Sequence, residues 1–538
     1  MDGNSPADVA GASDPDATRD ARGFFDTPLF DDPQARALAH VGVIDVGSNS
    51  IRLVVFDGAA RSPAYFFNEK VLCGLGRGLA ETGKLNPEGR IRAMATLKRF
   101  ALLARGMTLS NLTMVATAAM REAEDGPEFR AEIEAATGLR MRVIDGDEEA
   151  RLSAQGVLTG WPEAEGLVCD IGGNSMELAV IGAGRVHQAV TSGLGPFRLQ
   201  QIPGGKKGLR QHVGDVLRGL SDQTGTHHDA LYLVGGSWRA IARLDMERRD
   251  YPLKVLHEYA MTPKNIRKTI DWITQQDMAE LRKLTGISEE RMSLVPLAAQ
   301  VLRQLVHVFS PRQVYVSSYG IREGILYDQM PDALRTRDPL LEACHFMEHS
   351  SARLPGFGKK LYEFLLPLYR NRPPERLRLI RAACLLHDVN WRAHPDYRAD
   401  ACFDITTRAN LGGLDHPGRI YLGIALMHRY KTSGMGPRMK DLAGLLDERD
   451  VKEAKMLGRA LRFGAMFSMD GPGNAGELRF YPKKKVLELV LQPEMQALFT
   501  EVAEQRFASL ANQIGASAKV RVRRGTRETG SEFEGDTV

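Results

Sequence analysis

One polar turn motif occurs twice in the chain, each time between two short apolar runs. The first copy reads VIDVGSNSIRLVVFDG and the second reads VCDIGGNSMELAVIGAG. A constant offset of 125 positions (170 − 45) relates the paired residues, which are Asp45 and Asp170, Gly47 and Gly172, Asn49 and Asn174, and Ser50 and Ser175. Any β-hairpin favours Gly, Asn and Ser at its bend, but agreement in both the turn and its flanking strands favours duplication. The sequence therefore predicts two related strand–turn–strand units.

The pattern of apolar residues changes along the chain. From residue 41 to about 332, short β-rich runs alternate with helical stretches, which is typical of layered α/β structure. From about 338 to 468, apolar residues recur every three or four positions, as in RLRLIRAACLLHDV, which predicts helices. The expected parts are a disordered arm (1–39), a first lobe (40–152), a second lobe (153–332), a helical domain (333–470), a small α+β domain (471–518) and a charged tail (519–538).

Composition limits the class of protein. The chain has 538 residues, of which 43% are hydrophobic and 26% charged, as in a globular protein with several cores. No stretch approaches the ~18 uncharged apolar residues that span a bilayer, and no secretory signal opens the sequence. We therefore expect a cytoplasmic protein without a membrane partner. Its five dispersed cysteines are expected to be buried, reduced thiols.

The two turns have the composition of phosphate-binding loops. Glycine lets backbone N–H groups face a concavity without an obstructing Cβ, while Ser and Asn side chains add hydrogen-bond donors. The expected phosphate ligands are Gly47, Ser48, Asn49, Ser50 and Arg52 in the first copy, and Gly172, Gly173, Asn174 and Ser175 in the second. Asp45 and Asp170 end the strand before each turn, where a carboxylate can bind Mg²⁺ directly or through water.

Seven motifs carry a resemblance to a known family. They are DVGSNSIRLVVFDG, ATAAMREAEDGPEFRAEI, IDGDEEARLSAQGV, CDIGGNSMELAV, SGLGPFRL, YLVGGSWRAIARL and VYVSSYGIREGIL, in that order. The order resembles that of the exopolyphosphatase and guanosine pentaphosphate phosphatase family, within the actin, sugar kinase and Hsp70 superfamily. The resemblance implies an α/β fold with a two-lobed actin-like (RNase H-like) core, an all-α HD-like domain and a small C-terminal α+β domain. It also implies Mg²⁺, K⁺ and a homodimer.

In that family a glutamate activates water against a terminal phosphorus, and IDGDEEARL offers two adjacent candidates. If Asp145 caps a helix, Glu148 lies three residues later and can fold back in a capping box. Glu149 is then free, and it also matches the family's catalytic position. Glu177 stands where the first copy has Arg52, and the family places an essential glutamate there. We expect Glu177 to join Asp170 around Mg²⁺ or to orient water.

Two arginines complete the expected phosphate site. Arg121 matches the family's phosphate-contacting arginine, and Arg198 is a weaker companion. The planar guanidinium binds two phosphate oxygens at once, although a surface position remains the alternative for both. The second loop reads GGNS where the family commonly has GGGS. Asn174 tolerates the turn conformation, so the loop is expected to form. The added side chain is expected either to narrow the pocket or to supply a further hydrogen-bond donor.

The second half of the chain contains basic runs and histidine motifs. Lys483, Lys484, Lys485, Arg521 and Arg523 are expected to form a track for a long polyanion, with solvated surface charge as the alternative. The stretch HFMEH fits an inverted zinc-protease pattern by five letters only. His349, the pair His387–Asp388, and His416 or His428 resemble the ligand order of HD phosphohydrolases. We interpret them as a remnant and expect no tightly held transition metal.

Together these features predict an exopolyphosphatase. The expected reaction is Mg²⁺-dependent, processive hydrolysis of terminal orthophosphate from inorganic polyphosphate, with Glu149 as general base. The main alternative is a guanosine pentaphosphate 5′-phosphohydrolase that uses the same groups. A non-catalytic polyphosphate- or nucleotide-binding regulator and a superfamily kinase are further alternatives. No nucleic-acid polymer is expected as a partner.

Overall fold

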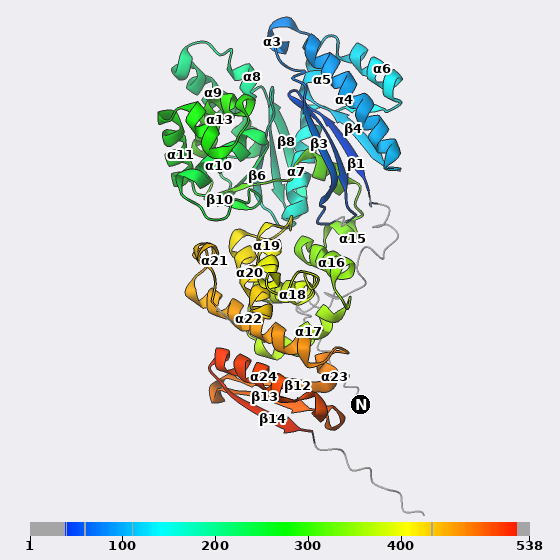
Figure 1. Cartoon of the computed structure of the whole chain (residues 1–538). Helices are drawn as coiled ribbons and strands as arrows, with labels where there is room; N and C mark the ends of the chain where they lie inside the picture. Colours follow the sequence, from blue (N-terminus) through cyan, green and yellow to red (C-terminus); the bar gives the residue numbers. More distant parts are fainter. Residues whose placement is uncertain (1–37, 39, 59–60, 110, 432–433, 524–538) are drawn as a thin grey trace, which may run out of the picture.

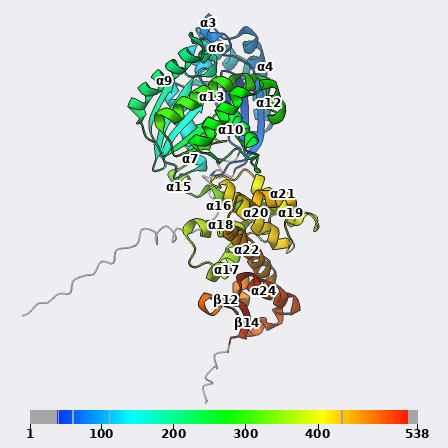
Figure 2. The same cartoon turned by 90° about the vertical axis from the view of Figure 1, so that its left-hand side faces the viewer.

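The structure is a computed structural model that describes residues 38, 40–58, 61–109, 111–431 and 434–523. The predictions of a disordered N-terminal arm and of a tail beyond residue 523 fall outside the described residues. Two α/β lobes form one end of an elongated molecule, helices fill its middle, and a small sheet forms the other end (Figures 1 and 2).

The first lobe is built on a five-stranded sheet in the order β3-β2-β1-β4-β5. β1 is apolar apart from Asp45, and its side chains are buried or nearly so, as expected for a central strand. The elements are β1 (Gly42–Val46), β2 (Ser50–Phe56), β3 (Tyr65–Leu72), α3 (Leu79–Thr82), α4 (Pro87–Gly106), β4 (Leu112–Ala116), α5 (Ala118–Glu122), α6 (Gly126–Thr137), β5 (Met141–Val143) and α7 (Gly146–Gly160).

The second lobe has a six-stranded sheet in the order β10-β11-β9-β6-β7-β8. Its elements are β6 (Gly166–Ile171), β7 (Met176–Gly182), β8 (Arg185–Ser192), α8 (Pro196–Leu199), α9 (Gly205–Thr224), β9 (Ala230–Val234), α10 (Gly236–Arg248), β10 (Tyr259–Met261), α11 (Pro263–Gln275), α12 (Met278–Thr285), α13 (Glu289–Phe309), β11 (Gln313–Val316), α14 (Ile321–Asp328) and α15 (Asp332–Arg335).

The two sheets repeat one topology. In each, a three-stranded antiparallel meander is followed by parallel strands, so that β1, β2 and β3 correspond to β6, β7 and β8. β1 then pairs in parallel with β4, as β6 does with β9. The prediction of two related strand–turn–strand units is therefore confirmed.

Helices α7 and α14 cross between the lobes at very close range. A Cβ on Gly156 of α7 would overlap the backbone of Gly320, just before α14, and a Cβ on Gly324 of α14 would overlap the carbonyl of Leu152. Two helices approach this closely only where glycine leaves out the side chain. The lobe boundary expected between residues 152 and 153 lies inside α7, which packs on β7 and β8. This crossing forms a rigid connection below the cleft between the lobes.

The helical domain and a small α+β unit follow. The helices are α16 (Pro339–Ser351), α17 (Phe357–Leu365), a 3₁₀ turn (Leu366–Leu368), α18 (Pro374–Leu386), α19 (Arg398–Arg408), α20 (His416–Tyr430), α21 (Pro437–Ala443), α22 (Glu448–Phe467) and α23 (Pro472–Ala475). The last unit contains β12 (Gly476–Tyr481), a 3₁₀ turn (Pro482–Lys484), β13 (Val486–Leu491), a 3₁₀ helix (Pro493–Leu498), α24 (Glu501–Ile514) and β14 (Ser517–Val522). Residues 519–522 thus belong to a strand paired with β13, and the prediction that the charged tail begins at residue 519 is wrong.

A segment of the helical domain, residues 409–416, packs against both lobes. Asn410 donates its side-chain amide to the carbonyl of Pro63 (2.9 Å) in the first lobe. Leu414 donates its backbone N–H to the Glu258 carboxyl (2.7 Å) in the second lobe. His416 accepts or donates a hydrogen bond at 2.9 Å with the Tyr251 hydroxyl, also in the second lobe. The middle of the molecule is therefore joined to both halves of the cleft.

The structure bears on two predictions made from composition, one about the cysteines and one about apolar stretches. All five cysteines are buried and free, as expected. One helix in the described part of the chain, α13, is long and apolar enough to cross a membrane by length and composition. It carries Arg291 and Arg303, so it is not the uncharged apolar run that the prediction excluded. α13 is a core helix of the second lobe, with 61% of its apolar window buried.

Candidate active site

The two hairpin turns face one another across a cavity of about 450 Å³ between the lobes. They have matched geometry, because Gly47 donates its N–H to the Ser50 carbonyl at 3.0 Å and Gly172 does the same to Ser175 at 3.0 Å. Of the predicted phosphate ligands, those that line the cavity are Gly47, Ser48, Asn49, Ser50, Arg52, Gly172, Gly173 and Ser175. Asp45 and Asp170 line it as well.

Glu149 reaches the same cavity from the first turn of α7. Asp145 caps that helix by accepting the Glu148 N–H at 2.8 Å, as predicted. The predicted capping box is wrong, however, because the Glu148 side chain pairs with Arg142 and Arg151 at 3.1 and 2.9 Å. Glu149 is nonetheless left free to point inward, with 9% of its surface exposed.

Arg121 contacts Glu149, but it is not among the described residues that line the cavity. One Nη1 donates to the Glu149 carboxylate (3.3 Å) and to the carbonyl of Ile144 (2.8 Å). This double contact fixes the orientation of the Glu149 carboxylate. In the structure Arg121 therefore positions a glutamate, and its direct contact with phosphate stays a prediction.

Four carboxyl groups gather at this end of the cleft and disfavour one another's charge. Burial raises the pKa of Asp45 and of Asp170, with Arg322 opposing the shift at Asp45 and the Ser153 hydroxyl, hydrogen-bonded to Asp170, opposing it there. Burial and then the Asp170 charge raise the pKa of Glu149 to about 8, while Arg121 lowers it. Burial and then the Glu149 charge raise the pKa of Glu177. A cation among these groups would favour their ionised forms.

Glu177 is more deeply buried than the other three carboxyl groups. Its residue is 2% exposed, and it accepts a hydrogen bond from the Thr191 hydroxyl at 3.3 Å. It pairs across the hairpin with Asp170, just as Arg52 pairs with Asp45. Glu177 is not among the described residues that line the cavity. Because the Glu149 charge raises its pKa, Glu177 interacts electrostatically with a residue that does line it.

Sequence reasoning missed most of the cations that face these carboxyl groups. Besides Arg52, the cationic lining residues are Lys70, Arg239, Arg243, Arg291 and Arg322. Burial and then the charges of Arg291 and Arg52 lower the pKa of Lys70 to about 8. Burial and then Arg322 lower the pKa of Arg239 to about 10. Arg239 and Arg322 stand in the quoted motifs YLVGGSWRAIARL and VYVSSYGIREGIL, which were the available signal.

These cations have few acidic partners. Arg322 lies 3.8 Å from Asp45, whereas Arg52, Lys70, Arg239, Arg243 and Arg291 have no ion pair within the described residues. The Nε atoms of Arg52 and Arg322 are buried and have no hydrogen-bond partner. Buried guanidinium donors are normally satisfied, so this wall of the cavity has the properties of an anion site.

The donor set also fits Mg²⁺. Within the described residues, no group of three or more His, Cys, Asp or Glu side chains is close enough to hold a metal ion alone. Mg²⁺ typically takes one or two carboxylates and completes its shell with waters and substrate phosphates. Asp45 and Asp170, at equivalent ends of the two hairpins, offer such a pair.

Arg198 and Asn174 lie on the outer side of the phosphate loops. Arg198 pairs with Glu122 of the other lobe and lines two outer cavities together with Asn174. Neither residue lines the main cavity in the described part of the chain. That they bind phosphate directly stays a prediction.

The predicted polyanion track lies at the opposite end of the molecule. Lys483 and Lys484 belong to the 3₁₀ turn after β12, and Arg521 lies on β14, with the helical domain between them and the cleft (Figure 1). The Arg521 side chain lies 3.8 Å from Glu488 on the neighbouring strand. These residues stay a prediction for remote contacts with a long chain.

The HD-like histidines are held by protein groups. Asp388 accepts two hydrogen bonds from Arg353 at 2.6 and 2.7 Å. His387 bonds to the Cys384 carbonyl (2.7 Å) and His428 to the Lys431 carbonyl (2.9 Å). A guanidinium thus occupies the coordinating face of Asp388.

Comparison with known proteins assigns the family. The description "Ppx/GppA phosphatase family" matches residues 54–333, which is more than half of the chain. The chain belongs to the Ppx/GppA phosphatase family. Residues 369–520 match a second description, "Exopolyphosphatase, C-terminal". The resemblance to this family is therefore confirmed, and the matched residues 54–333 form most of the two α/β lobes.

Relatives of this family member carry two kinds of name. Exopolyphosphatase 1 of Mycobacterium tuberculosis is 24% identical over 331 residues, covering 59% of this chain and 94% of that protein. Retrograde regulation protein 2 of Saccharomyces cerevisiae is 24% identical over 430 residues, covering 72% of each. Among solved structures, an exopolyphosphatase from Cytophaga hutchinsonii aligns with a TM-score of 0.48 and 23% identity, over 53% of this chain and 96% of that one.

Proposed function

We propose that this Ppx/GppA family member is a Mg²⁺-dependent exopolyphosphatase that removes terminal orthophosphate from inorganic polyphosphate. The observation that carries the proposal is that one cleft holds a group of carboxyl side chains together with several cations. Glu149, Asp45 and Asp170 line the same cavity as Lys70, Arg239, Arg243 and Arg291. A chain of phosphates needs many positive contacts, but its reacting end needs a base.

The positions of the two loops and of the exposed Arg243 set the direction of the substrate. The terminal phosphate is held by the N–H groups and hydroxyls of the two loops, next to Glu149. The following phosphates then lie against Arg239, Lys70 and Arg291. Arg243 lines the cavity and is exposed to solvent, so the chain leaves the cleft on that side.

The reaction is hydrolysis by an activated water. Glu149 accepts a proton from the water while the water oxygen forms a bond with the terminal phosphorus and the bond to the bridging oxygen breaks. The bridging oxygen keeps the electron pair and becomes the new chain end. Arg121 holds the Glu149 carboxylate in orientation, and Arg52 and Arg322 balance charge on the phosphate.

Asp45 and Asp170 would hold Mg²⁺, with Glu177 as a carboxylate behind them. When bound, the ion supplies positive charge to phosphate oxygens and favours the ionised state of the nearby carboxyl groups. K⁺ is expected from the family resemblance alone.

The lining of the cleft favours polyphosphate over guanosine pentaphosphate. A guanine ring needs an aromatic or apolar face together with hydrogen-bonding groups placed for its edge. Within the described lining, Tyr65 is the one aromatic side chain, and its hydroxyl donates to Glu323 at 2.6 Å. The positions beyond the terminal phosphate are occupied by cations, which suit further phosphates better than a nucleoside.

A regulator without turnover is the other alternative, because one relative carries a regulator's name. The chain nevertheless keeps Glu149, Asp170 and Glu177 in one buried group whose mutual repulsion disfavours ionisation. Binding of an anion alone gains nothing from these carboxyl groups, whereas hydrolysis requires a base.

Phosphate release in the presence of Mg²⁺ tests the proposal, with long-chain polyphosphate, guanosine pentaphosphate and ATP as parallel substrates. We expect polyphosphate to be hydrolysed fastest, and Glu149→Gln to lose at least ~100-fold in kcat, as for removal of a general base. Glu148→Gln is the matched control, since its side chain pairs with arginines outside the cavity. Faster hydrolysis of guanosine pentaphosphate would contradict the substrate assignment, and no hydrolysis of any substrate would contradict the reaction.

A further inference from the structure

The two phosphate loops touch each other between the lobes. A Cβ on Gly173 would lie 3.4 Å from the Cβ of Ser48, in the opposite lobe. A Cβ on Gly76, which follows β3, would lie 2.9 Å from the Cβ of Ser48 and 3.3 Å from the Asn174 amide nitrogen. Ser48 and Asn174 are 6% and 3% exposed. No chain of phosphates can pass between loops packed this closely.

Phe197 covers the same contact from outside. Its backbone N–H donates to the Gly173 carbonyl at 2.9 Å. Its ring lies 2.8 Å from the position that a Cβ on Gly173 would take. The ring therefore lies between the Gly173 loop and an outer cavity of about 250 Å³, which Phe197 and Asn174 line and which adjoins the main cavity at Asn49 and Leu294.

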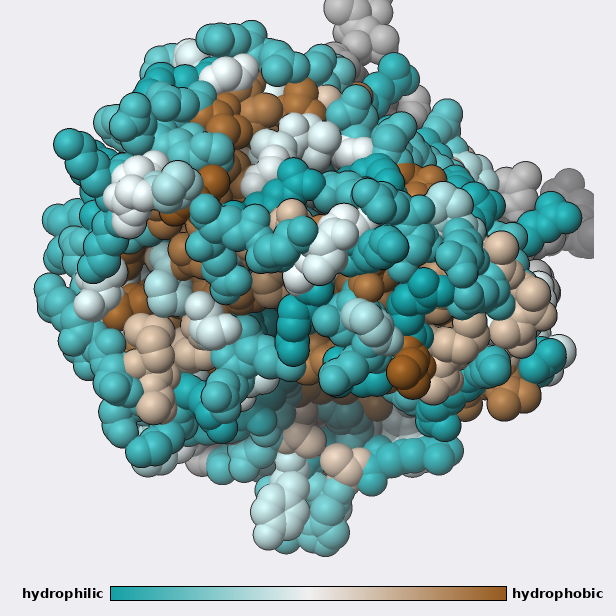
Figure 3. Space-filling view, turned by 90° about the horizontal axis from the view of Figure 1, so that it is seen from above, coloured by the Kyte–Doolittle hydropathy of each residue, from teal (hydrophilic) through white to brown (hydrophobic). Residues whose placement is uncertain are grey.

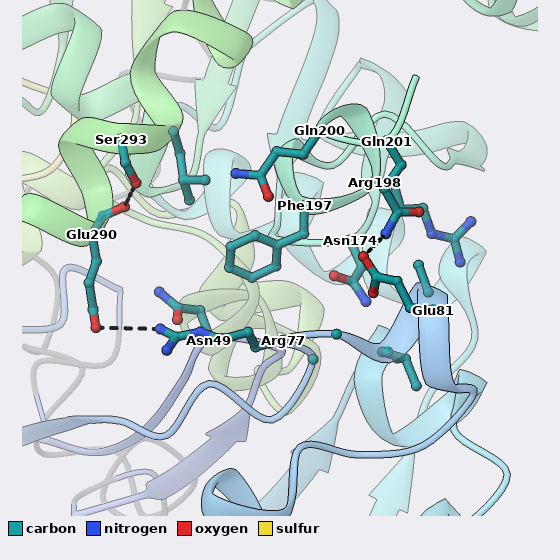
Figure 4. Close-up of a pocket in the computed structure, with 15 residues that line it drawn as sticks. Asn49, Arg77, Glu81, Asn174, Phe197, Arg198, Gln200, Gln201, Glu290 and Ser293 are labelled. Carbon is teal, nitrogen blue, oxygen red and sulfur yellow. Dashed lines mark hydrogen bonds and ion pairs between the residues drawn. The ribbon is translucent and has the colours of Figure 1, made fainter. Parts of the chain in front are cut away.

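A third layer joins the lobes beyond Phe197. Arg77 of the first lobe lies 3.7 Å from Glu290 of the second. Gln201 donates to Glu81, and Arg198 pairs with Glu122, in each case from the second lobe to the first. Figure 4 shows the Phe197 ring between the Arg77–Glu290 pair and the Gln201–Glu81 pair. We call these three pairs the interlobe bridges.

The bridges sit at the end of the molecule that carries α3 and α8, the top of Figure 1. Viewed from that end, the surface over the two lobes is mostly hydrophilic (Figure 3). The main cavity reaches solvent at Arg243, which lines it and is exposed. Between the two loops, the contact of Ser48 with Gly173 and the Phe197 ring obstruct passage.

We propose that Ser48, Asn174 and Phe197 form an end wall that restricts the enzyme to chain termini, and that Phe197 is a specificity-determining residue for this exo mode of cleavage. The inference rests on the proposed function. An interior phosphate is bonded to phosphates on both sides. To bring its phosphorus beside Glu149, the chain has to continue past the loops, where the wall lies. A terminal phosphate has no such continuation, so its free oxygens meet the loops.

The test uses long polyphosphate with free ends and the same polymer with both ends blocked as bulky phosphoramidates. Wild type should release orthophosphate from free-ended chains and leave blocked chains at full length on a gel. The double variant Phe197→Ala, Asn174→Gly should cut blocked chains internally, giving products of intermediate length. Phe66→Ala is the matched control, because Phe66 is 59% exposed on β3, and it should behave as wild type.

A second measurement keeps the test decisive if the double variant fails to fold. Blocked chains should inhibit wild type with an inhibition constant at least ~10-fold above the KM of free-ended chains, because a blocked end cannot seat against the wall.

Internal cutting of blocked chains by wild type, or an inhibition constant equal to that KM, would overturn the inference. A double variant that remains active on free-ended chains yet leaves blocked chains intact would overturn it too. If wild type releases no phosphate from free-ended chains, it is the proposed function that fails.

Discussion

Replacing Lys70 with methionine should weaken polyphosphate binding and remove most of the pH dependence of KM. Lys70 lies on β3 opposite Arg52, and its pKa is lowered to about 8 by burial and by the charges of Arg291 and Arg52. A lysine that loses its proton near pH 8 attracts phosphate through its positive charge below that pH and loses this attraction above it. Between pH 7 and pH 9 the charged fraction falls from about nine-tenths to about one-tenth.

The magnitude follows from one charge-assisted contact. Such a hydrogen bond contributes ~1.5–3 kcal/mol, and the lower figure applies here because the neighbouring arginines share the phosphate. We therefore expect Lys70→Met to raise KM ~10-fold at pH 7 with kcat little changed. Wild-type KM should rise by a similar factor from pH 7 to pH 9. Lys70→Arg should keep a low KM across this range, because a guanidinium remains charged.

The assay is initial-rate phosphate release at several polyphosphate concentrations and at constant ionic strength. Lys98→Met is the control, because Lys98 is an exposed lysine on α4 of the same lobe. Thermal unfolding should show no loss of stability in Lys70→Met, since the change relieves repulsion among like charges. A KM within twofold of wild type in Lys70→Met, or a pH-dependent KM in Lys70→Arg matching that of wild type, would refute the reasoning.

Three further predictions concern other parts of the molecule. Gly324→Ala should lower the free energy of unfolding by ~1–3 kcal/mol, because the added methyl overlaps the Leu152 carbonyl. Thermal denaturation measures this loss. Gly219→Ala on α9 is the control and should show no loss of stability, because the space around its Cβ is open. Chelation should abolish phosphate release and added Mg²⁺ should restore it, while full activity in excess chelator would exclude the proposed cation. Replacing Lys483, Lys484 and Lys485 with alanine should raise KM for long chains at low salt and leave KM for short chains unchanged; an equal effect on both would argue against a remote track.

Local sequence patterns predicted the scaffold of the site because they are contained in short segments. The two hairpins follow from a repeated turn with its flanking strands, and their register places Asp45 and Asp170 at equivalent positions. Asp145 and Glu149 follow from the start of a helix, where capping chemistry depends on neighbours within four residues. The predicted capping box was wrong because the Glu148 side chain forms ion pairs with Arg142 and Arg151 instead.

The cationic side of the cleft lay beyond sequence reasoning. Lys70, Arg239 and Arg291 come from β3, α10 and α13, and only the closure of two lobes brings them to one cavity. Lys70 and Arg291 stand outside the recognised motifs, and Arg239 stands within one, YLVGGSWRAIARL, that by itself gives no reason to place it beside phosphate. The same holds for Phe197, whose ring acquires its place from the loop that it covers. Long-range assembly, which no local pattern encodes, decides these positions.

The contact of residues 409–416 with both lobes bears on how the length of such proteins can change in evolution. The mycobacterial relative is matched over 94% of its own length by 59% of this chain, so part of this chain has no counterpart in that match. In this chain the helical segment covers Glu258, and the buried His416 bonds to Tyr251 of the second lobe. Loss of the helical domain by truncation would bare these groups to water and release the constraint across the cleft. A version of this chain without the helical domain would therefore need compensating substitutions at this surface.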